Sequence, residues 1–167
     1  IMIEEGILDE VLPPIEVKEF SKVITAEKKY SVSPSHLVRL FSLNKSIGKK
    51  WAHYVSLTSN EAKMLEFIKE SLAHYKELKT VAYKFGRGVA EGWLLNFYDG
   101  SFGVIPSKIS EIINTGCNAF FPISGVDLLD EMEEGPELGR QMERLEKLWI
   151  KSGFKMSKKD LLSKSKS

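Results

Sequence analysis

The stretch "GPELGRQMERLEKLWIKSGF", from Gly135 to Phe154, has the start signal and the periodicity of an amphipathic helix. Gly135 allows the chain to turn sharply, and Pro136 has the fixed φ angle that suits the first helical position. Glu137 places a negative charge beside the positive end of the helix dipole. The sequence therefore predicts a helix that begins at Pro136.

Two stripes of opposite character run along this predicted helix. The apolar stripe consists of Leu138, Met142, Leu145 and Trp149, and the basic stripe consists of Arg140, Arg144, Lys147 and Lys151. At 100° per residue the two stripes lie on nearly opposite sides of the helix. Two interpretations remain open. The basic stripe contacts RNA phosphates, or it is the solvated face of an ordinary helix in which Glu143 pairs with Lys147.

The preceding segment "SGVDLLDEM" predicts a short helix, which makes a helix, hairpin, helix arrangement with the helix from Pro136. The turn at Gly135 and Pro136 and the helix N-terminus after it can then approach a phosphate. Six carboxylates and no base occur between residues 127 and 137, and a solvated helix end explains them better than a cation site.

Helix signals recur along the rest of the chain. Ser33 and Pro34 predict one helix start, and Thr58 with Glu61 predicts a capping box at another. Ser124 with Asp127 and Ser157 with Asp160 resemble two further caps, and Pro106 predicts a helix that ends near Gly116. Because no alternating strand pattern occurs, we expect an all-α fold, an antiparallel helical bundle-like array with a C-terminal helix-hairpin-helix-like element.

The segment "LKTVAYKFGRGVAEGWLLNFYDG" has apolar residues at helical spacing and a polar side that includes Lys84, Arg87 and Glu91. Its glycines, Gly86, Gly88 and Gly92, indicate either a break or a close approach of two helices, since each costs a helix about 1 kcal/mol. We favour close packing, because the apolar face continues through them. Lys84 and Arg87 are further candidate RNA contacts.

Domain organisation follows from these elements. We expect a helical body over residues 1–117 and a helix-turn-helix tail element, packed on the body, over residues 118–157. We expect a terminal turn and a disordered Lys/Ser tail over residues 158–167.

Composition narrows the class of protein. The chain has 167 residues, of which 43% are hydrophobic, so it can bury a core. Its single cysteine, Cys117, excludes an internal disulfide. The sequence has no long apolar run and no signal segment, so we expect a cytoplasmic protein without a membrane partner. The net charge of +1 hides basic blocks, such as eight bases against two acids over residues 18–50, which permit contact with a polyanion.

Catalytic motifs are absent from the sequence. It has no Asp-x-Asp pair for two metals, no Gly-rich phosphate loop, and no Ser or Cys nucleophile motif. The three histidines, His36, His53 and His74, are scattered singly and predict no metal site. We therefore predict no catalytic residue, no metal ligand and no cofactor in this chain, and we expect it to be non-catalytic by itself.

Several stretches resemble the bacterial CCA-adding tRNA nucleotidyltransferases and the related poly(A) polymerases. "FPISGVDLLDEMEEGPELGRQMERLEKLWIKSGF" is similar to their C-terminal signature of an Asp-Leu-Leu helix, a Gly-Pro-x-x-Gly turn and a helix ending in Trp-Ile. "IMIEEGILDEVLPPI", "LTSNEAKML" and "AYKFGRGVAEGWLL" are similar to the segment after the family's neck and to two of its body helices. The resemblance covers nearly the whole chain, and residues 18–50 are its least distinctive part.

The resemblance implies that this chain is the body and tail that hold RNA, and that a catalytic head and a neck precede it. The head would bind Mg²⁺ and ATP or CTP, and it would be joined in cis or supplied in trans. The expected partner is tRNA or another structured RNA. The turn motif adds Gly139 to the candidate contacts Gly135 and Pro136. The sequence departs from the pattern at "DEMEEGPELG", where an acidic hairpin would repel phosphate, and this shifts the expected contact toward Arg140 and Arg144. The alternative function is a helical module that docks a protein, such as a separate catalytic subunit.

Overall fold

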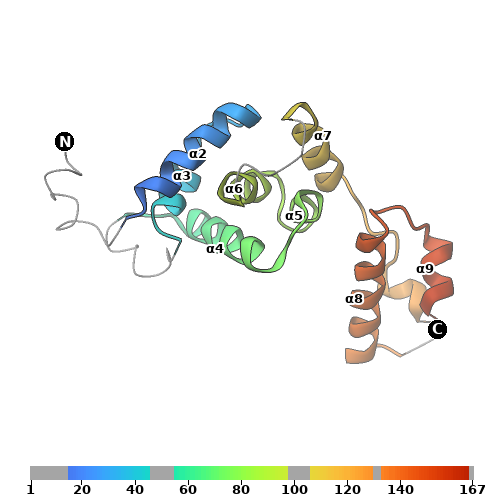
Figure 1. Cartoon of the computed structure of the whole chain (residues 1–167). Coiled ribbons are helices and arrows are strands. Elements are labelled where there is room, and N and C mark those ends of the chain that lie inside the picture. Colours follow the sequence, from blue (N-terminus) through green and yellow to red (C-terminus); the bar gives the residue numbers. More distant parts are fainter. Residues whose placement is uncertain (1–14, 46–54, 98–105, 130–132, 166–167) are drawn as a thin grey trace, which may run out of the picture. The chain divides into compact units, whose positions relative to one another are not determined.

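The computed structural model describes residues 15–45, 55–97, 106–129 and 133–165. Every regular element in these ranges is a helix, so the predicted all-α class is confirmed (Figure 1). The contacts divide the chain into two compact units, residues 1–118 and 119–167.

The first unit contains six of the described helices. They are α2 (Val17–Tyr30), α3 (His36–Leu43), α4 (Ser59–His74), α5 (Leu78–Phe85), α6 (Arg87–Phe97) and α7 (Pro106–Cys117). The predicted helix from Pro106 to about Gly116 is therefore confirmed. Helix α6 lies at the centre of this unit and packs against α2, α3, α4, α5 and α7. Its residues Trp93, Leu94 and Leu95 are almost completely buried, and the Trp93 indole Nε1–H donates to the Tyr75 carbonyl at 3.3 Å.

The three glycines of the segment around α6 have different roles. Gly86 ends α5 with φ 81°, a conformation that glycine adopts without strain, so the predicted uninterrupted helix is wrong at this point. Gly92 confirms the close approach, because a Cβ atom there would lie 2.6 Å from Ile68 Cδ1. Gly88 faces only the flexible end of Met64.

A fourth glycine, Gly116, sets the distance between α5 and α7. A Cβ atom at this position would collide with the Lys79 carbonyl oxygen and lie 2.7 Å from the Ala82 Cβ. Two helix backbones therefore meet with no side chain between them, which is possible only for glycine.

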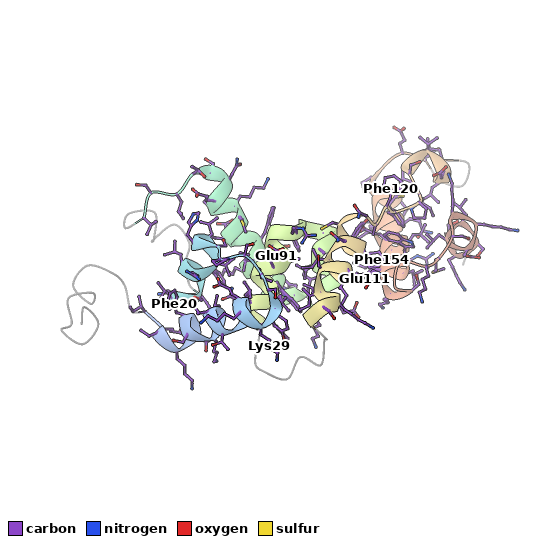
Figure 2. All side chains as sticks on the ribbon, turned by 90° about the horizontal axis from the view of Figure 1, so that it is seen from above. Phe20, Lys29, Glu91, Glu111, Phe120 and Phe154 are labelled. Carbon is purple, nitrogen blue, oxygen red and sulfur yellow. The ribbon has the colours of Figure 1, made fainter. Side chains whose placement is uncertain are left out.

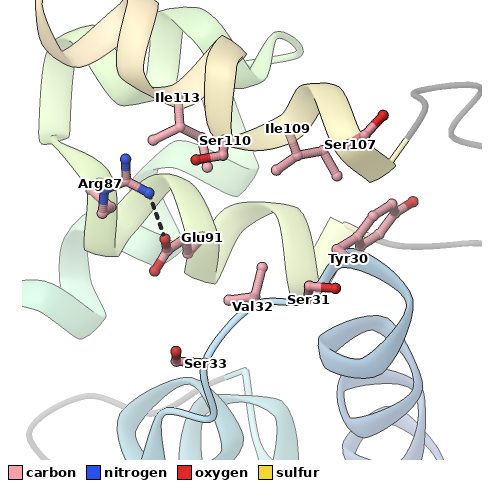
Figure 3. A pocket seen from close by; sticks show the side chains of 10 residues that line it. All are labelled: Tyr30, Ser31, Val32, Ser33, Arg87, Glu91, Ser107, Ile109, Ser110 and Ile113. Atoms are coloured by element: carbon pink, nitrogen blue, oxygen red, sulfur yellow. Dashed lines mark hydrogen bonds and ion pairs between the residues drawn. The ribbon is translucent and has the colours of Figure 1, made fainter.

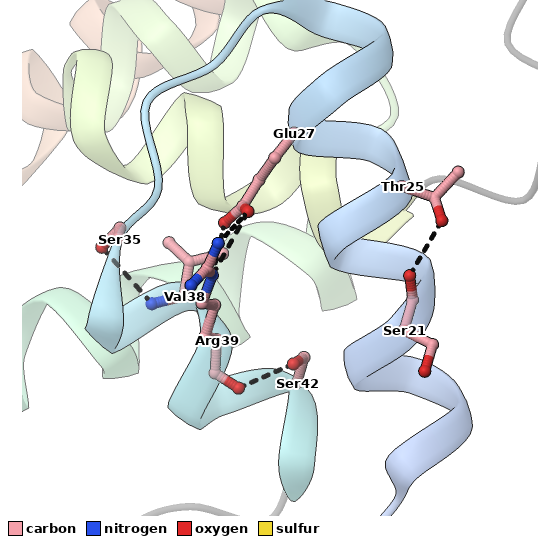
Figure 4. A network of polar contacts seen from close by, with 7 residues as sticks. All are labelled: Ser21, Thr25, Glu27, Ser35, Val38, Arg39 and Ser42. Carbon is pink, nitrogen blue, oxygen red and sulfur yellow. Dashed lines mark hydrogen bonds and ion pairs between the residues drawn. The ribbon is translucent and has the colours of Figure 1, made fainter.

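A bidentate ion pair joins α2 to α3 (Figure 4). The Arg39 guanidinium donates from Nε to Glu27 Oε1 at 3.1 Å and from an Nη to Oε2 at 2.7 Å. Glu27 is only 4% exposed, so Arg39 compensates a charge that water does not reach. The same contact raises the pKa of Arg39 above its usual range.

The caps of the helices agree with the sequence at three positions and differ at one. Thr58 and Glu61 form the predicted capping box of α4, and Ser124 with Asp127 and Ser157 with Asp160 make the predicted contacts. The predicted start at Ser33 and Pro34 is wrong, because Ser35 is the N-cap of α3 and accepts from the Val38 N–H. Pro34 therefore lies before the helix and not at its first position.

The second unit contains η2 (Gly125–Leu128), α8 (Pro136–Lys151) and α9 (Lys158–Ser165). Helix α8 begins at Pro136, as the sequence predicts. The short helix predicted before the hairpin is only a single turn of 3-10 helix, and the hairpin residues 130–132 lie outside the described residues. The predicted packing of this unit on the body stays a prediction.

The predicted disordered tail over residues 158–167 is wrong for residues 158–165, which form helix α9, and residues 166 and 167 lie outside the described residues. Leu161 is completely buried and anchors α9 in the second unit, where α9 packs on α8. The Gln141 amide donates to the Ser165 carbonyl at 3.0 Å and holds the end of the helix. The polar composition of this segment did not predict helix α9, because one buried leucine and a capping contact are enough to stabilise the helix.

We expect Gly116→Ala to lower the free energy of unfolding by about 1 to 3 kcal/mol, because the added methyl group must move a backbone segment. Gly88→Ala is the matched control and should change it by less than about 1 kcal/mol, since the Met64 side chain can move aside. Urea denaturation followed by circular dichroism measures both. Equal stability of the two variants would contradict the close crossing of α5 and α7.

Candidate functional site

The apolar and basic sides of α8 lie as the periodicity predicts. Leu145 and Trp149 are buried, and Leu138 and Met142 are half-buried. The Trp149 ring packs edge-on against Phe154, with centroids 4.8 Å apart. The four basic residues of the opposite stripe, Arg140, Arg144, Lys147 and Lys151, are all exposed.

The exposed bases of α8 differ in how they are held. Arg140 pairs with Glu137 at 2.7 Å. Lys147 pairs with Glu143 at 2.7 Å, as the alternative interpretation predicts. The Arg140 and Lys147 side chains remain 70% and 66% exposed. Exposed pairs of this kind contribute little free energy, so both cations can exchange a carboxylate for a phosphate.

Arg144 differs, because it supports the fold of the second unit. Its Nε donates to Gln141 Oε1 at 3.0 Å, and an Nη donates to the Lys164 carbonyl at 2.5 Å. A guanidinium near the C-terminus of α9 satisfies an otherwise unpaired carbonyl and complements the helix dipole. Arg144 is therefore exposed at the surface and also supports the fold of the second unit.

The N-terminus of α8 is open to solvent. Gly135 is the N-cap and supplies no side-chain hydrogen bond, and Pro136 is the first helical residue. Gly135, Pro136, Glu137 and Gly139 are all exposed. A Cβ atom at Gly139 would meet nothing within 4 Å, so no contact inside the described chain requires glycine there. The predicted turn contacts are thus accessible, although Glu133 and Glu134 precede them with negative charge.

The charge of the second unit is divided along the sequence. From Leu138 to the last residue, nine bases stand against Glu143, Glu146 and Asp160, whereas residues 127–137 carry only acids. One of these acids belongs to the fold, because Asp127 pairs with Lys158 at 2.6 Å and joins η2 to the start of α9. Lys158 and the cap contacts with Ser124 lower the pKa of Asp127 to about 2.

Lys84 and Arg87 lie in the first unit, on either side of the break at Gly86. The Lys84 ammonium lies 5.5 Å from the centre of the Tyr83 ring. Arg87 pairs with Glu91 at 3.1 Å and also donates to the Asn114 side chain of α7. Lys84 and Arg87 belong to the first unit, and the bases of α8 belong to the second unit.

Arg87 and Glu91 lie at the edge of an open cleft of about 530 Å³ (Figure 3). Helices α6 and α7 and the segment after α2 form its walls. The sequence placed Arg87 and Glu91 on a polar face, but it gave no sign of the cleft, because residues far apart in the chain form it. Its serines are Ser31, Ser33, Ser107 and Ser110.

A small set of apolar side chains on the second unit is exposed. Phe120 is 84% exposed, Val126 is 75% exposed, and Leu129 is also exposed (Figure 2 labels Phe120). Exposed apolar side chains of this size are typical of surfaces that dock a protein. They are the specific observation that favours the alternative function.

Comparisons with known proteins give no family for this chain, since no family model, curated protein or solved structure matches it. None of the described helices is both long and apolar enough to cross a bilayer. Within the described ranges, no three His, Cys, Asp or Glu side chains gather in a group that could hold a metal ion.

We expect the second unit to lose stability as the pH falls from about 4 toward 2. The folded-state pKa of Asp127 is about 2 and lies below the unfolded value of about 3.9. Ionised Asp127 therefore stabilises the fold above about pH 4, and protonation removes this contribution as the pH falls through the folded-state pKa. Acid titration followed by NMR of the Trp149 indole, which lies in the second unit, measures the effect.

The Asp127→Asn variant should be less stable than the natural chain at neutral pH. It should lose less stability than the natural chain between about pH 4 and 2. Glu134→Gln, an exposed carboxylate in the same acidic stretch, is the control and should titrate like the natural chain. The same acid response in the Asp127 variant as in the natural chain would show that the Lys158 pair does not hold η2 to α9.

Proposed function

We propose that this chain is the RNA-holding helical part of a nucleotidyltransferase that extends RNA 3′ ends, related to the CCA-adding enzymes and poly(A) polymerases. It would act in the cytoplasm on tRNA or another structured RNA. A catalytic head, joined in cis or supplied in trans, would bind Mg²⁺ and ATP or CTP and carry out the transfer. The observation that carries the proposal is the exposed basic side of α8 opposite its buried apolar side.

Geometry favours contact with an RNA backbone. Arg140, Lys147 and Lys151 extend over about 16 Å of one helix at 1.5 Å per residue. This length matches several successive phosphates of a nucleic-acid strand, and the helix presents its cations on one side. The open N-terminus of α8 adds backbone N–H groups that favour an anion.

Recognition of this kind reads shape more than sequence. The major groove of duplex RNA is too deep and narrow for side chains, so a rigid helix with cations on its outer side binds phosphates and 2′-hydroxyl groups. The buried Leu145 and Trp149 and the Arg144 contact to α9 hold α8 in the second unit. A basic helix that is anchored in this way suits an RNA-holding part that does no chemistry itself.

The alternative is a module that docks a protein through the apolar residues Phe120, Val126 and Leu129. The two functions differ in their response to salt. Phosphate contacts weaken steeply as salt rises because bound counterions are released, whereas an apolar interface changes little.

We expect Arg140→Ala combined with Lys147→Ala to weaken tRNA binding and to make its salt dependence shallower. Losing up to two phosphate contacts lowers the slope of log affinity against log salt by about 1 to 2 units. Both side chains form only exposed pairs, so the melting temperature should stay nearly unchanged. The measurement is tRNA binding over a salt series, with a melting curve for each protein.

Lys69→Ala combined with Lys76→Ala is the matched control, because it removes the same charge from exposed positions of the first unit. It should retain most of the affinity and nearly the full slope. If the α8 variant kept the slope of the natural chain, the basic side of α8 would be a solvated surface and the proposal would fail. Arg144 is left intact, since its replacement would also disturb α9.

A further inference from the structure

Core residues and exposed serines together line the cleft beside Arg87. Ile109 and Ile113 of α7 are buried and line it, together with half-buried Val32. Four serines surround this apolar lining, and all are exposed. Within the described residues, none of the four hydroxyl groups makes a hydrogen bond. The cleft therefore combines apolar contact area with hydroxyl groups that are available to a ligand.

Arg87 and Glu91 place a donor and an acceptor side by side at this cleft (Figure 3). Arg87 is held from two sides, by Glu91 Oε1 at 3.1 Å and by the Asn114 side chain. Arginine has five N–H donors, so several remain for a ligand. Glu91 uses one oxygen for Arg87, and its carboxylate can accept further hydrogen bonds.

This arrangement excludes several simple ligand classes. Arg87 and Glu91 neutralise each other, so the cleft offers neither a lone phosphate nor a lone metal ion the net opposite charge that would hold it. A wholly apolar molecule would remove water from the serine hydroxyl groups without replacing their hydrogen bonds. The remaining class is a neutral, flat group with apolar faces and with donors and acceptors next to each other on its edge.

We propose that the cleft binds a guanine base. The N1–H and the amino group of guanine are adjacent donors that suit the Glu91 carboxylate, and its O6 and N7 atoms are acceptors that suit arginine. Adenine, in contrast, has only its single amino group to donate on the same edges. The half-buried Val32 contacts a face of the base, and the exposed serine hydroxyl groups bind the ribose.

The size of the cleft agrees with such a ligand. About 530 Å³ lies within the range of roughly 300 to 1,000 Å³ found for small-molecule sites. A free guanine nucleotide and an unpaired guanosine of an RNA present the same base. Binding of an unpaired guanosine of an RNA rests on the proposed RNA-holding function, whereas binding of a free guanine nucleotide does not.

The test measures binding of guanosine monophosphate and adenosine monophosphate to the full chain by calorimetry. We expect saturable binding of the guanine nucleotide, at least about tenfold tighter than binding of the adenine nucleotide. Glu91→Gln should lose at least about tenfold in affinity for guanosine monophosphate, the usual effect of losing a hydrogen bond to a charged group. Ser110→Tyr, an exposed position that would fill the cleft, should abolish binding.

Glu70→Gln on α4 is the control for Glu91→Gln, because it removes an exposed carboxylate from another helix, and its binding should be unchanged. Circular dichroism confirms that each variant is folded. Three results would overturn the proposal: no binding at millimolar nucleotide, equal binding of both nucleotides, or natural affinity in both the Glu91 and Ser110 variants.

Two further measurements separate the source of the base from the function of α8. An oligoribonucleotide with an unpaired guanosine displaces guanosine monophosphate if the cleft takes its base from RNA, and a matched oligoribonucleotide with adenosine does not. Failure of both to displace it assigns the cleft to free nucleotide. The variant with Arg140→Ala and Lys147→Ala should bind guanosine monophosphate like the natural chain. Its tRNA binding tests the function of α8, and its nucleotide binding tests the cleft, so either proposal can fail without the other.

Discussion

The contact between Gly116 of α7 and the backbone of α5 is the constraint on which the first unit depends. The Lys79 carbonyl and the Ala82 side chain lie so close to Gly116 that no side chain can stand between the helices. This crossing fixes α7 against the α5–α6 pair, and it thereby brings Asn114 within reach of Arg87. The orientation of Arg87, and with it the polar edge of the cleft, follows from a packing contact elsewhere on α7.

The second unit meets a different requirement, because α8 must be buried on one side and charged on the other. Leu145 and Trp149 anchor it, and Arg144 uses its guanidinium to hold the end of α9. Arg140 and Lys147 pair only with exposed carboxylates of their own helix, so their charges stay accessible. Basic residues at the same helical spacing therefore divide into one that supports the fold and others that are available to a partner.

The sequence predicted the elements whose signals are local. The all-α class, the start of α8 at Pro136 and the capping box at Thr58 depend on neighbouring residues, and they were confirmed. The sequence did not predict the features that depend on contacts between distant residues. Helix α9 exists because Leu161 is buried in the second unit, and the cleft exists because three separate segments meet around Glu91. Gly86 and Gly92 look alike in sequence, yet one ends a helix and the other lets two helices approach. The RNA-binding role of the basic stripe stays a prediction.

The most direct test of the RNA-holding account is NMR of the full chain during titration with tRNA. If α8 holds RNA, the largest amide shifts occur on its outer side, around Arg140, Lys147 and Lys151, and raising the salt concentration reverses them. Absence of shifts along α8 at saturating tRNA, or shifts confined to the surroundings of Phe120 and Val126, would contradict it.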